Sequence, residues 1–183
     1  VNPEENGYSL GILEGFTFKK AIGTNLKDDF DHEDGGILFF KNIDHTVILR
    51  DLKFLNSHGA ENTYGGVIAI VSSAGPFLIS HALFENNYAT GKTSGGGAIA
   101  IMEGVRLNME KVIFKHNNAA NSAKGGALYA SNVYDGVDGK RPFIDMKETV
   151  FVDNSASSSN GGAMFVLETD LEITRCSYEQ NQA

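Results

Sequence analysis

The sequence contains one cysteine, three prolines and no tryptophan, and it has fewer basic than acidic residues. Because Cys176 is alone, no disulfide bond can form within the chain. Fifteen Lys and Arg against 23 Asp and Glu give a net charge of −8, which argues against nucleic acid or an anionic membrane as the main partner. No apolar run reaches the roughly 18 residues of a membrane-spanning helix, so we expect no insertion of this segment into a bilayer.

The chain does contain an ordinary share of apolar residues and an excess of glycine and asparagine. Of its 183 residues, 42% are hydrophobic, 21 are glycine and 16 are asparagine. This apolar content is too high for a disordered chain. We expect a single domain over residues 1–183, long enough to bury a core without a metal ion or a disulfide.

A glycine pair followed by an apolar run occurs five times. The second glycines of successive pairs are separated by 30, 31, 29 and 36 residues. The pairs begin at Gly35, Gly65, Gly96, Gly125 and Gly161.

A second motif, an aromatic residue followed three positions later by asparagine, alternates with the glycine pairs. Looser copies begin at Phe18 and Phe54, and two apolar residues precede each aromatic by seven and five positions in nearly every copy. Such i, i+2 spacing is the period of a strand with one face buried. The four full copies are Phe84/Asn87, Phe114/Asn117, Phe151/Asn154 and Tyr178/Asn181.

Each unit of about 30 residues therefore carries three short strands separated by corners rich in Gly, Asn, Ser and Ala. The pattern predicts an all-β, right-handed parallel β-helix of about six coils. Equivalent residues of successive coils then lie one strand spacing apart, so the aromatics form a stack and the asparagines form an amide ladder. Asparagine also tolerates the left-handed conformation, so we expect the ladder residues to occupy the corners.

Two insertions interrupt the repeat, at residues 24–34 and 132–141. The first is acidic, and its carboxylates could hold calcium, although the spacing fits neither an EF-hand loop nor a nonapeptide calcium repeat and a solvated loop is favoured. The candidate ligands are Asp28, Asp29, Asp31 and Asp34. The second insertion could bind an acidic sugar or a protein partner, or it could be ordinary loop variation. Its candidate residues are Tyr134, Asp135, Asp138, Lys140 and Arg141.

The four residues after each glycine pair are apolar on both faces of the predicted strand. If the second and fourth point inward, an outward apolar strip results that could contact another segment or subunit. The alternative is a bend at the glycines that turns part of the run inward. The large residues of this strip are Phe39, Tyr129 and Phe165, with Ala69 and Ala100 between them.

The alternation of Gly-Gly-Ala-Ile/Leu/Met with Phe-x-x-Asn resembles the polymorphic membrane protein family of chlamydial autotransporters. The resemblance covers residues 35–183, with Gly96-Gly97-Ala98-Ile99 as a full match. It implies a secreted or surface-displayed β-helix passenger that acts in adhesion or antigenic display, and it implies no catalytic residue. Passengers of that family are longer, richer in cysteine and end in a membrane barrel. We therefore expect this chain to be a fragment whose coils continue past Ala183.

The leading hypothesis is a noncatalytic surface β-helix whose partner is a protein or glycan of a host or neighbouring cell, with no cofactor. A carbohydrate-active enzyme of the pectin-lyase type is a rival, because Asp145 and Glu172 occupy one outward row. A structural filament or sheath subunit, self-associating through its coil ends or the apolar strip, is another.

Overall fold

The computed structural model describes residues 10–22, 36–59, 65–90, 95–121, 123–132, 140–157 and 160–183. The acidic insertion at 24–34, with its four candidate calcium ligands, lies outside these residues, and so do Tyr134, Asp135 and Asp138 of the second insertion. The described part of the chain consists of strands and turns, and it contains no helix that is long and apolar enough to cross a membrane.

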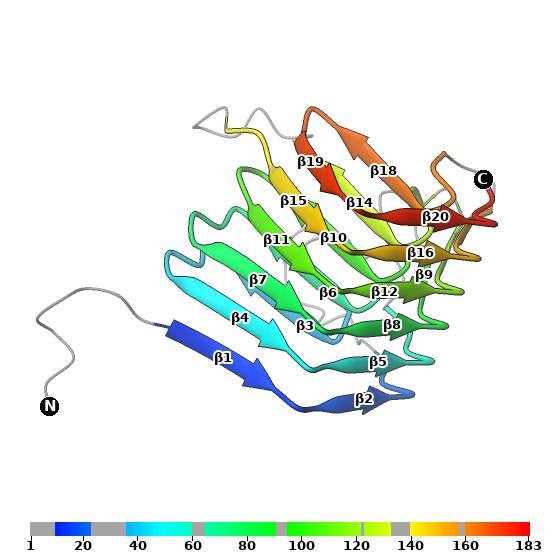
Figure 1. Cartoon of the computed structure of the whole chain (residues 1–183), viewed down its shortest axis with the longest axis horizontal. Coiled ribbons are helices and arrows are strands. Elements are labelled where there is room, and N and C mark those ends of the chain that lie inside the picture. The colour runs from blue at the N-terminus through cyan, green and yellow to red at the C-terminus, as the bar shows by residue number, and fades with distance from the viewer. Residues whose placement is uncertain are drawn as a thin grey trace, which may run out of the picture.

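Four sheets of parallel strands run along the molecule (Figure 1). Sheet I contains β1 (Leu10–Glu14), β4 (Thr46–Arg50), β7 (Pro76–Ser80), β11 (Arg106–Glu110), β15 (Phe143–Lys147) and β19 (Asp170–Thr174). Sheet II contains β2 (Thr17–Lys19), β5 (Lys53–Leu55), β8 (Leu83–Glu85), β12 (Ile113–Lys115), β16 (Val150–Val152) and β20 (Ser177–Glu179). Sheet III contains β9 (Tyr88–Thr90), β13 (Asn118–Ala120) and β17 (Ser155–Ala156). Sheet IV contains β3 (Leu38–Lys41), β6 (Ile68–Val71), β10 (Ile99–Met102), β14 (Leu128–Ser131) and β18 (Met164–Leu167).

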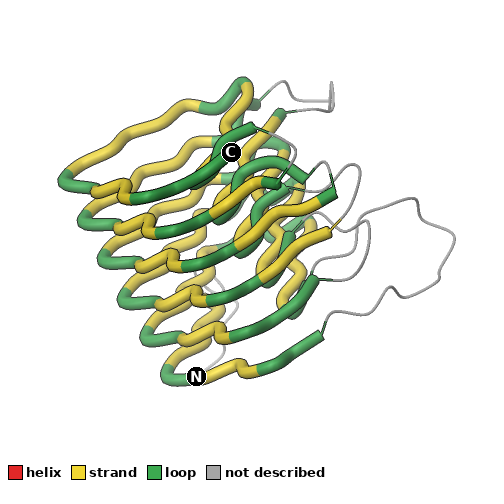
Figure 2. Tube along the Cα trace, turned by 90° about the vertical axis from the view of Figure 1, so that its right-hand side faces the viewer, coloured by secondary structure: helices red, strands yellow, loops and turns green. Residues whose placement is uncertain are grey.

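The chain passes from sheet I through sheets II and III to sheet IV and then enters sheet I of the next coil. Figures 1 and 2 show the coils stacked from the N-terminal to the C-terminal end, each turning in the right-handed sense. The structure confirms the predicted parallel β-helix. Three of the coils also have one strand more than expected. In these coils the two or three residues that follow the ladder asparagine pair with their equivalents in neighbouring coils and form the short strands of sheet III.

The aromatic residues at the centre of each sheet II strand form one continuous stack inside the coils. Neighbouring ring centroids are 4.8–5.0 Å apart, and the ring planes are tilted by no more than 14°. This distance equals the spacing of paired strands, so in-register pairing sets the stacking. The stack contains Phe18, Phe54, Phe84, Phe114, Phe151 and Tyr178.

An amide ladder runs beside this stack, and Asn117 shows its pattern. Its side-chain nitrogen Nδ2 donates to the carbonyl of Phe84 in the preceding coil at 2.9 Å and to Oδ1 of Asn154 in the next coil at 3.0 Å. The same Oδ1 also accepts from the backbone N–H of Asn117 at 3.0 Å. Asn87 and Asn154 repeat this pattern, and the side chains of all three are buried. Each asparagine thus satisfies polar groups of the coils on either side.

The two glycines of a pair have different roles. The first glycine of the pairs at Gly96, Gly125 and Gly161 has a φ of 71–79°, a conformation that side chains disfavour. The second glycine lies against the second glycine of the next coil. A Cβ atom on Gly97 would overlap the carbonyl oxygen of Gly126, and one on Gly66 would overlap the carbonyl oxygen of Gly97. The pairs at Gly96 and Gly125 therefore each supply one left-handed residue and one close contact between coils.

In the described coils, the sharp corners on either side of sheet II are formed by left-handed residues, of which Gly15 alone is a glycine. The ladder asparagines were expected there, but the left-handed residue is the one before them, for example His116 before Asn117. A second corner lies between sheets I and II. It contains Gly15 and then Asp51, His81, Lys111, Glu148 and Arg175, whose φ angles are 50–54°. At four of these positions the backbone N–H donates to a carbonyl of the next coil, so pairing between coils holds the corner whatever its side chain. These positions are Asp51, His81, Lys111 and Glu148.

Replacing Gly97 by alanine tests the contact between the glycine pairs. We expect Gly97→Ala to lower the free energy of unfolding by about 3 kcal/mol or more, because the added methyl group overlaps backbone atoms that cannot move aside. Gly15→Ala is the control. Gly15 is left-handed at φ 75° but has open space around its Cβ position, so about 1 kcal/mol is expected. Urea unfolding measures both, and equal losses would contradict the packing explanation.

Replacing Asn117 by alanine tests the amide ladder. The substitution leaves buried donors of Asn87 and the carbonyl of Phe84 without partners, so we expect a loss of about 1–3 kcal/mol in the free energy of unfolding. Asn181→Ala in the last coil is the comparison variant: it removes the corresponding bonds to Asn154 and Phe151 at a half-buried position, so we expect a smaller loss. A neutral Asn117→Ala variant would show that the ladder does not stabilise the fold.

Candidate partner-binding site

The apolar strip predicted after the glycine pairs forms one column on the outward face of sheet IV. Phe39, Ala69, Ala100, Tyr129 and Phe165 are paired in register from β3 to β18. The second and fourth residues of each run, such as Ile68 and Ile70, instead join the interior core. The outward residues form a separate apolar cluster that also contains Val71 and Met102.

The middle of this column is buried, because the chain covers its own outward face. Ala69 and Ala100 are fully buried and Tyr129 is 6% exposed. Gly95 lies so close to the Tyr129 ring that a side chain on it would overlap the ring. In the next coil Lys124 takes the position of Gly95, and its ammonium group is 4.8 Å from the centre of the Phe165 ring. At Gly95 and Lys124, the segment that leads into a glycine pair thus covers the outward aromatic residue of the following coil.

The two ends of the strip remain accessible. Phe39 is 40% exposed in the first strand of sheet IV, and Phe165 is half-buried in the last strand. Leu167, two positions after Phe165 on the same face, is 45% exposed. A partner could contact these residues directly, whereas Tyr129 is accessible only if its covering segment moves away.

The second insertion leads into the start of β15, which lies between β11 and β19 in sheet I. Of its candidate residues, the structure describes Lys140 and Arg141, and both are exposed. Lys140 lies against the corner at Gly104 of the preceding coil. Beside them, the Arg106 guanidinium lies 4.9 Å from the centre of the Phe143 ring. The described end of the insertion therefore offers two cations and an aromatic ring on one edge of the rod.

The charged corner between sheets I and II is a solvated surface with some pairing between coils. Arg175 Nη2 donates to Glu148 Oε1 at 2.5 Å. This hydrogen bond, together with the attraction of the opposite charges, lowers the pKa of the Glu148 carboxyl group. Such exposed pairs contribute little to stability.

The two carboxylates considered for catalysis, Asp145 and Glu172, face each other in adjacent strands of sheet I. The Asp145 carboxylate is bound at 3.0 Å by Lys147 of its own strand, and it is 18% exposed. Glu172 is exposed on the outermost described strand. The row continues with Asn108 and Leu78, which supply neither a second acid nor a base. Asp145 and Glu172 are therefore close together, but the other described residues of their row add no acid or base that would complete an acid–base arrangement.

Within the described ranges, no group of three or more His, Cys, Asp or Glu side chains is placed to hold a metal ion. The members of the aromatic stack and the amide ladder lie in the interior, and among the described residues only the end members are accessible: Phe18 at the N-terminal end, and Tyr178 and Asn181 at the C-terminal end. Their contacts are with neighbouring coils, which makes them part of the scaffold.

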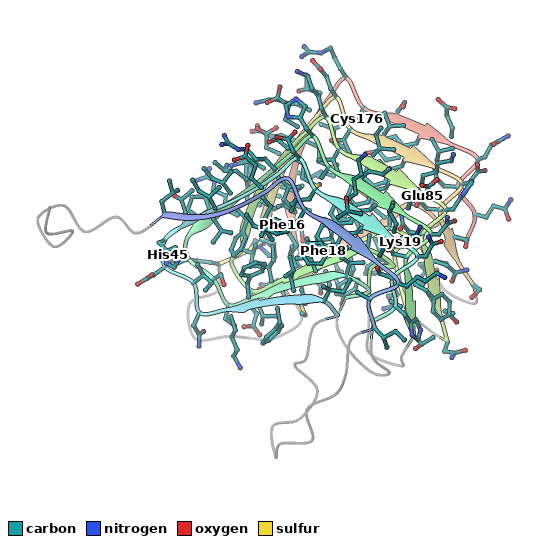
Figure 3. All side chains as sticks on the ribbon, turned by 90° about the horizontal axis from the view of Figure 1, so that it is seen from below. Phe16, Phe18, Lys19, His45, Glu85 and Cys176 are labelled. Carbon is teal, nitrogen blue, oxygen red and sulfur yellow. The ribbon has the colours of Figure 1, made fainter. Side chains whose placement is uncertain are left out.

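Sequence reasoning passed over the outward face of sheet II. Its residues lie directly before and after each buried aromatic residue, so the strand period does identify them. In Figure 3, Lys19 and Glu85 are labelled on the outside of this sheet, while Phe18 lies inside the coil. The face combines aliphatic and charged side chains, and Ile113 at its centre is 43% exposed.

Comparison with known proteins gives one match. The family model described as a Chlamydia polymorphic membrane protein repeat matches residues 81–101. The matched segment contains Phe84 and Asn87 of the second motif and the whole of Gly96-Gly97-Ala98-Ile99. No curated protein and no solved structure matches the chain significantly.

Tyr178 ends the aromatic stack and has a shifted acidity. Its ring lies 4.9 Å from that of Phe151, and burial, with a smaller effect of the nearby Cys176, raises the pKa of its phenol to about 12. In the unfolded chain the phenol ionises near pH 10. The folded chain therefore disfavours the phenolate.

The shift predicts a loss of stability in alkaline solution. The pKa of Tyr178 is higher in the folded than in the unfolded chain, so ionisation of this phenol does not change the free energy of unfolding below about pH 10. Above that pH, ionisation favours the unfolded chain, and the loss of stability grows as the pH rises towards about 12. Tyr178→Phe keeps the stacked ring and removes the ionisable group. We expect the urea midpoint of the variant to fall less between about pH 9 and pH 11 than that of the native chain. Identical pH dependence would show that the phenol ionises freely in the fold.

Proposed function

We propose that this chain is a segment of a noncatalytic, surface-displayed β-helix that acts in attachment or antigenic display. The observation that carries the proposal is the match of residues 81–101 to the Chlamydia polymorphic membrane protein repeat. The same two motifs recur in register in the neighbouring coils, as the glycine contacts and the amide ladder show. The repeat type thus extends beyond the matched segment.

The proposed location is outside the cell, as part of an autotransporter passenger. The matched family is named for membrane proteins, which supports a surface location. The net charge of −8 and the rod-like stacking of coils suit a stalk that holds loops away from a surface. The proposed partner is a protein or glycan on a host or neighbouring cell.

The insertion at residues 132–141 is the proposed contact region. Loops on a rigid solenoid commonly carry binding, and the described end of this one presents Lys140 and Arg141 beside Phe143. Phe39 and Phe165 are secondary candidates, because they are the accessible ends of the outward strip. We propose no catalytic residue and no cofactor.

Direct binding tests the proposed function. Labelled chain applied to immobilised glycans and to a panel of cultured animal cells is expected to bind at least one of them saturably. Absence of saturable binding to every glycan and every cell type would contradict a role in attachment. Turnover of any of the glycans would favour the carbohydrate-active enzyme instead.

Shortening the insertion tests the contact region. We expect replacement of residues 132–141 by a short Gly-Ser turn to leave the unfolding midpoint nearly unchanged, because β14 and β15 keep their partners in neighbouring coils. Binding to the responsive cells or glycans should fall at least about tenfold. Lys147→Ala on the adjacent face of sheet I is the control for an unspecific loss of positive charge. Unchanged binding of the shortened chain would exclude the insertion as the site.

A further inference from the structure

The outward face of sheet II has an order of side chains that is complementary to itself when it is reversed. The column directly after each buried aromatic residue is partly or fully exposed in every coil. From the first to the last coil it reads Lys19, Leu55, Glu85, Lys115, Val152 and Glu179. Read backwards against itself, this column brings every lysine opposite a glutamate and each aliphatic residue opposite the other.

We propose that sheet II is the interface of a homodimer in which a second copy of the chain lies antiparallel, face to face on the first. A two-fold axis parallel to the strands, passing between β8 and β12, reverses the order of coils and keeps each column opposite its own equivalent. Glu85 then faces Lys115 of the second copy, and Leu55 faces Val152. Lys19 faces Glu179 at either end of the interface.

The neighbouring outward column supports the same axis. It lies directly before the buried aromatic residues and reads Thr17, Lys53, Leu83, Ile113, Val150 and Ser177. Reversal places Leu83 opposite Ile113 at the centre and Thr17 opposite Ser177 at the ends. Lys53 meets Val150, where the aliphatic stem of the lysine can cover the valine. The centre of this column is thus apolar and its two ends are polar, while the charges at the centre of the interface belong to the neighbouring column.

The register of the dimer is determined by the two central charges. Within one chain, Lys115 Nζ lies 3.7 Å from Glu85 Oε1. The two-fold axis brings two such pairs together, so each charge gains a second opposite charge from the other copy. Moving the axis onto β8 would place Glu85 opposite itself, and moving it onto β12 would place Lys115 opposite itself. Like charges oppose either shift.

The outward face of sheet I shows that self-complementarity is not a general property of this repeat. Reversal of the column from Ile12 to Glu172 would place Ile12 opposite Glu172 and Ile48 opposite Asp145. In the next column Arg50 would face Lys147, which repels it. The outward strip of sheet IV is largely covered by the chain itself. Sheet II is therefore the face best suited to a second copy.

The size of the face predicts a weak dimer. Six strands at a spacing of about 4.8 Å and three residues of about 3.3 Å give a face of about 24 by 10 Å. A stable dimer buries about 800 Å² per partner, which is more than such a face supplies. Sedimentation of the full chain up to about 1 mM should therefore show reversible dimers that weaken as salt screens the charges.

Charge reversal at the centre provides the decisive test. Glu85→Lys leaves only lysines at the axis, and Lys115→Glu leaves only glutamates, so each variant alone should associate at least about tenfold more weakly than the native chain. An equimolar mixture of the two variants should recover dimers, because each supplies the charges that the other lacks. The double variant Glu85→Lys/Lys115→Glu should also dimerise by itself. Lys147→Glu on sheet I is the control, and it should associate like the native chain.

Three results would overturn the proposal: a native chain that stays monomeric at about 1 mM, association that neither charge reversal changes, or a mixture of the two single variants that fails to recover dimers. Unfolding midpoints show whether each variant is folded. The recovery in the mixture separates the contact between copies from the pair within one chain, because neither single variant retains that internal pair. The proposal goes beyond attachment and does not rest on it, so failure to bind cells or glycans would leave this test unaffected.

Discussion

Parallel, in-register pairing of successive coils is the constraint on which the rest of this structure depends. It places each residue about 4.8 Å from its equivalent in the next coil, a distance at which rings stack and amides exchange hydrogen bonds. Phe114 and Asn117 therefore meet their own residue types above and below. The same constraint makes the glycines necessary, because Gly97 and Gly126 approach too closely for any side chain.

The fold class was predictable because each inward column repeats several times with the strand period. A single Phe-x-x-Asn predicts little, whereas four full copies in step with five glycine pairs predict coils. The positions of the corners were harder to predict. At Lys111 and Glu148 the left-handed backbone carries side chains with no preference for it, so no residue type marks this corner. The backbone N–H of each donates to the next coil, and this inter-coil bond replaces local preference.

The candidate site was predictable only where it depends on strand alternation. Alternation offered an outward column with Tyr129 and Phe165 as one of two alternatives, and in the structure these residues form a cluster separate from the interior residues of sheet IV. It could not indicate that Gly95 and Lys124 lie over those rings, because this contact joins the segment before one glycine pair to the following coil. The short strands of sheet III were missed for a related reason: Ser155–Ala156 and its equivalents are too short to show a period and are held by their neighbours.

The division between repeated interior and variable exterior explains where the function of such a chain is encoded. The interior columns repeat an aromatic residue or an asparagine, or keep some other apolar side chain in nearly every coil, so they specify the stack of coils and nothing else. An outward residue touches only solvent and its neighbours in adjacent coils, so each coil can vary it at little cost to stability. Information about partners is therefore carried by the order of outward residues along a column. Sheets I and II are both six-stranded, parallel and in register, yet their outward columns differ in charge order: reversal brings opposite charges together on sheet II but places Arg50 opposite Lys147 on sheet I.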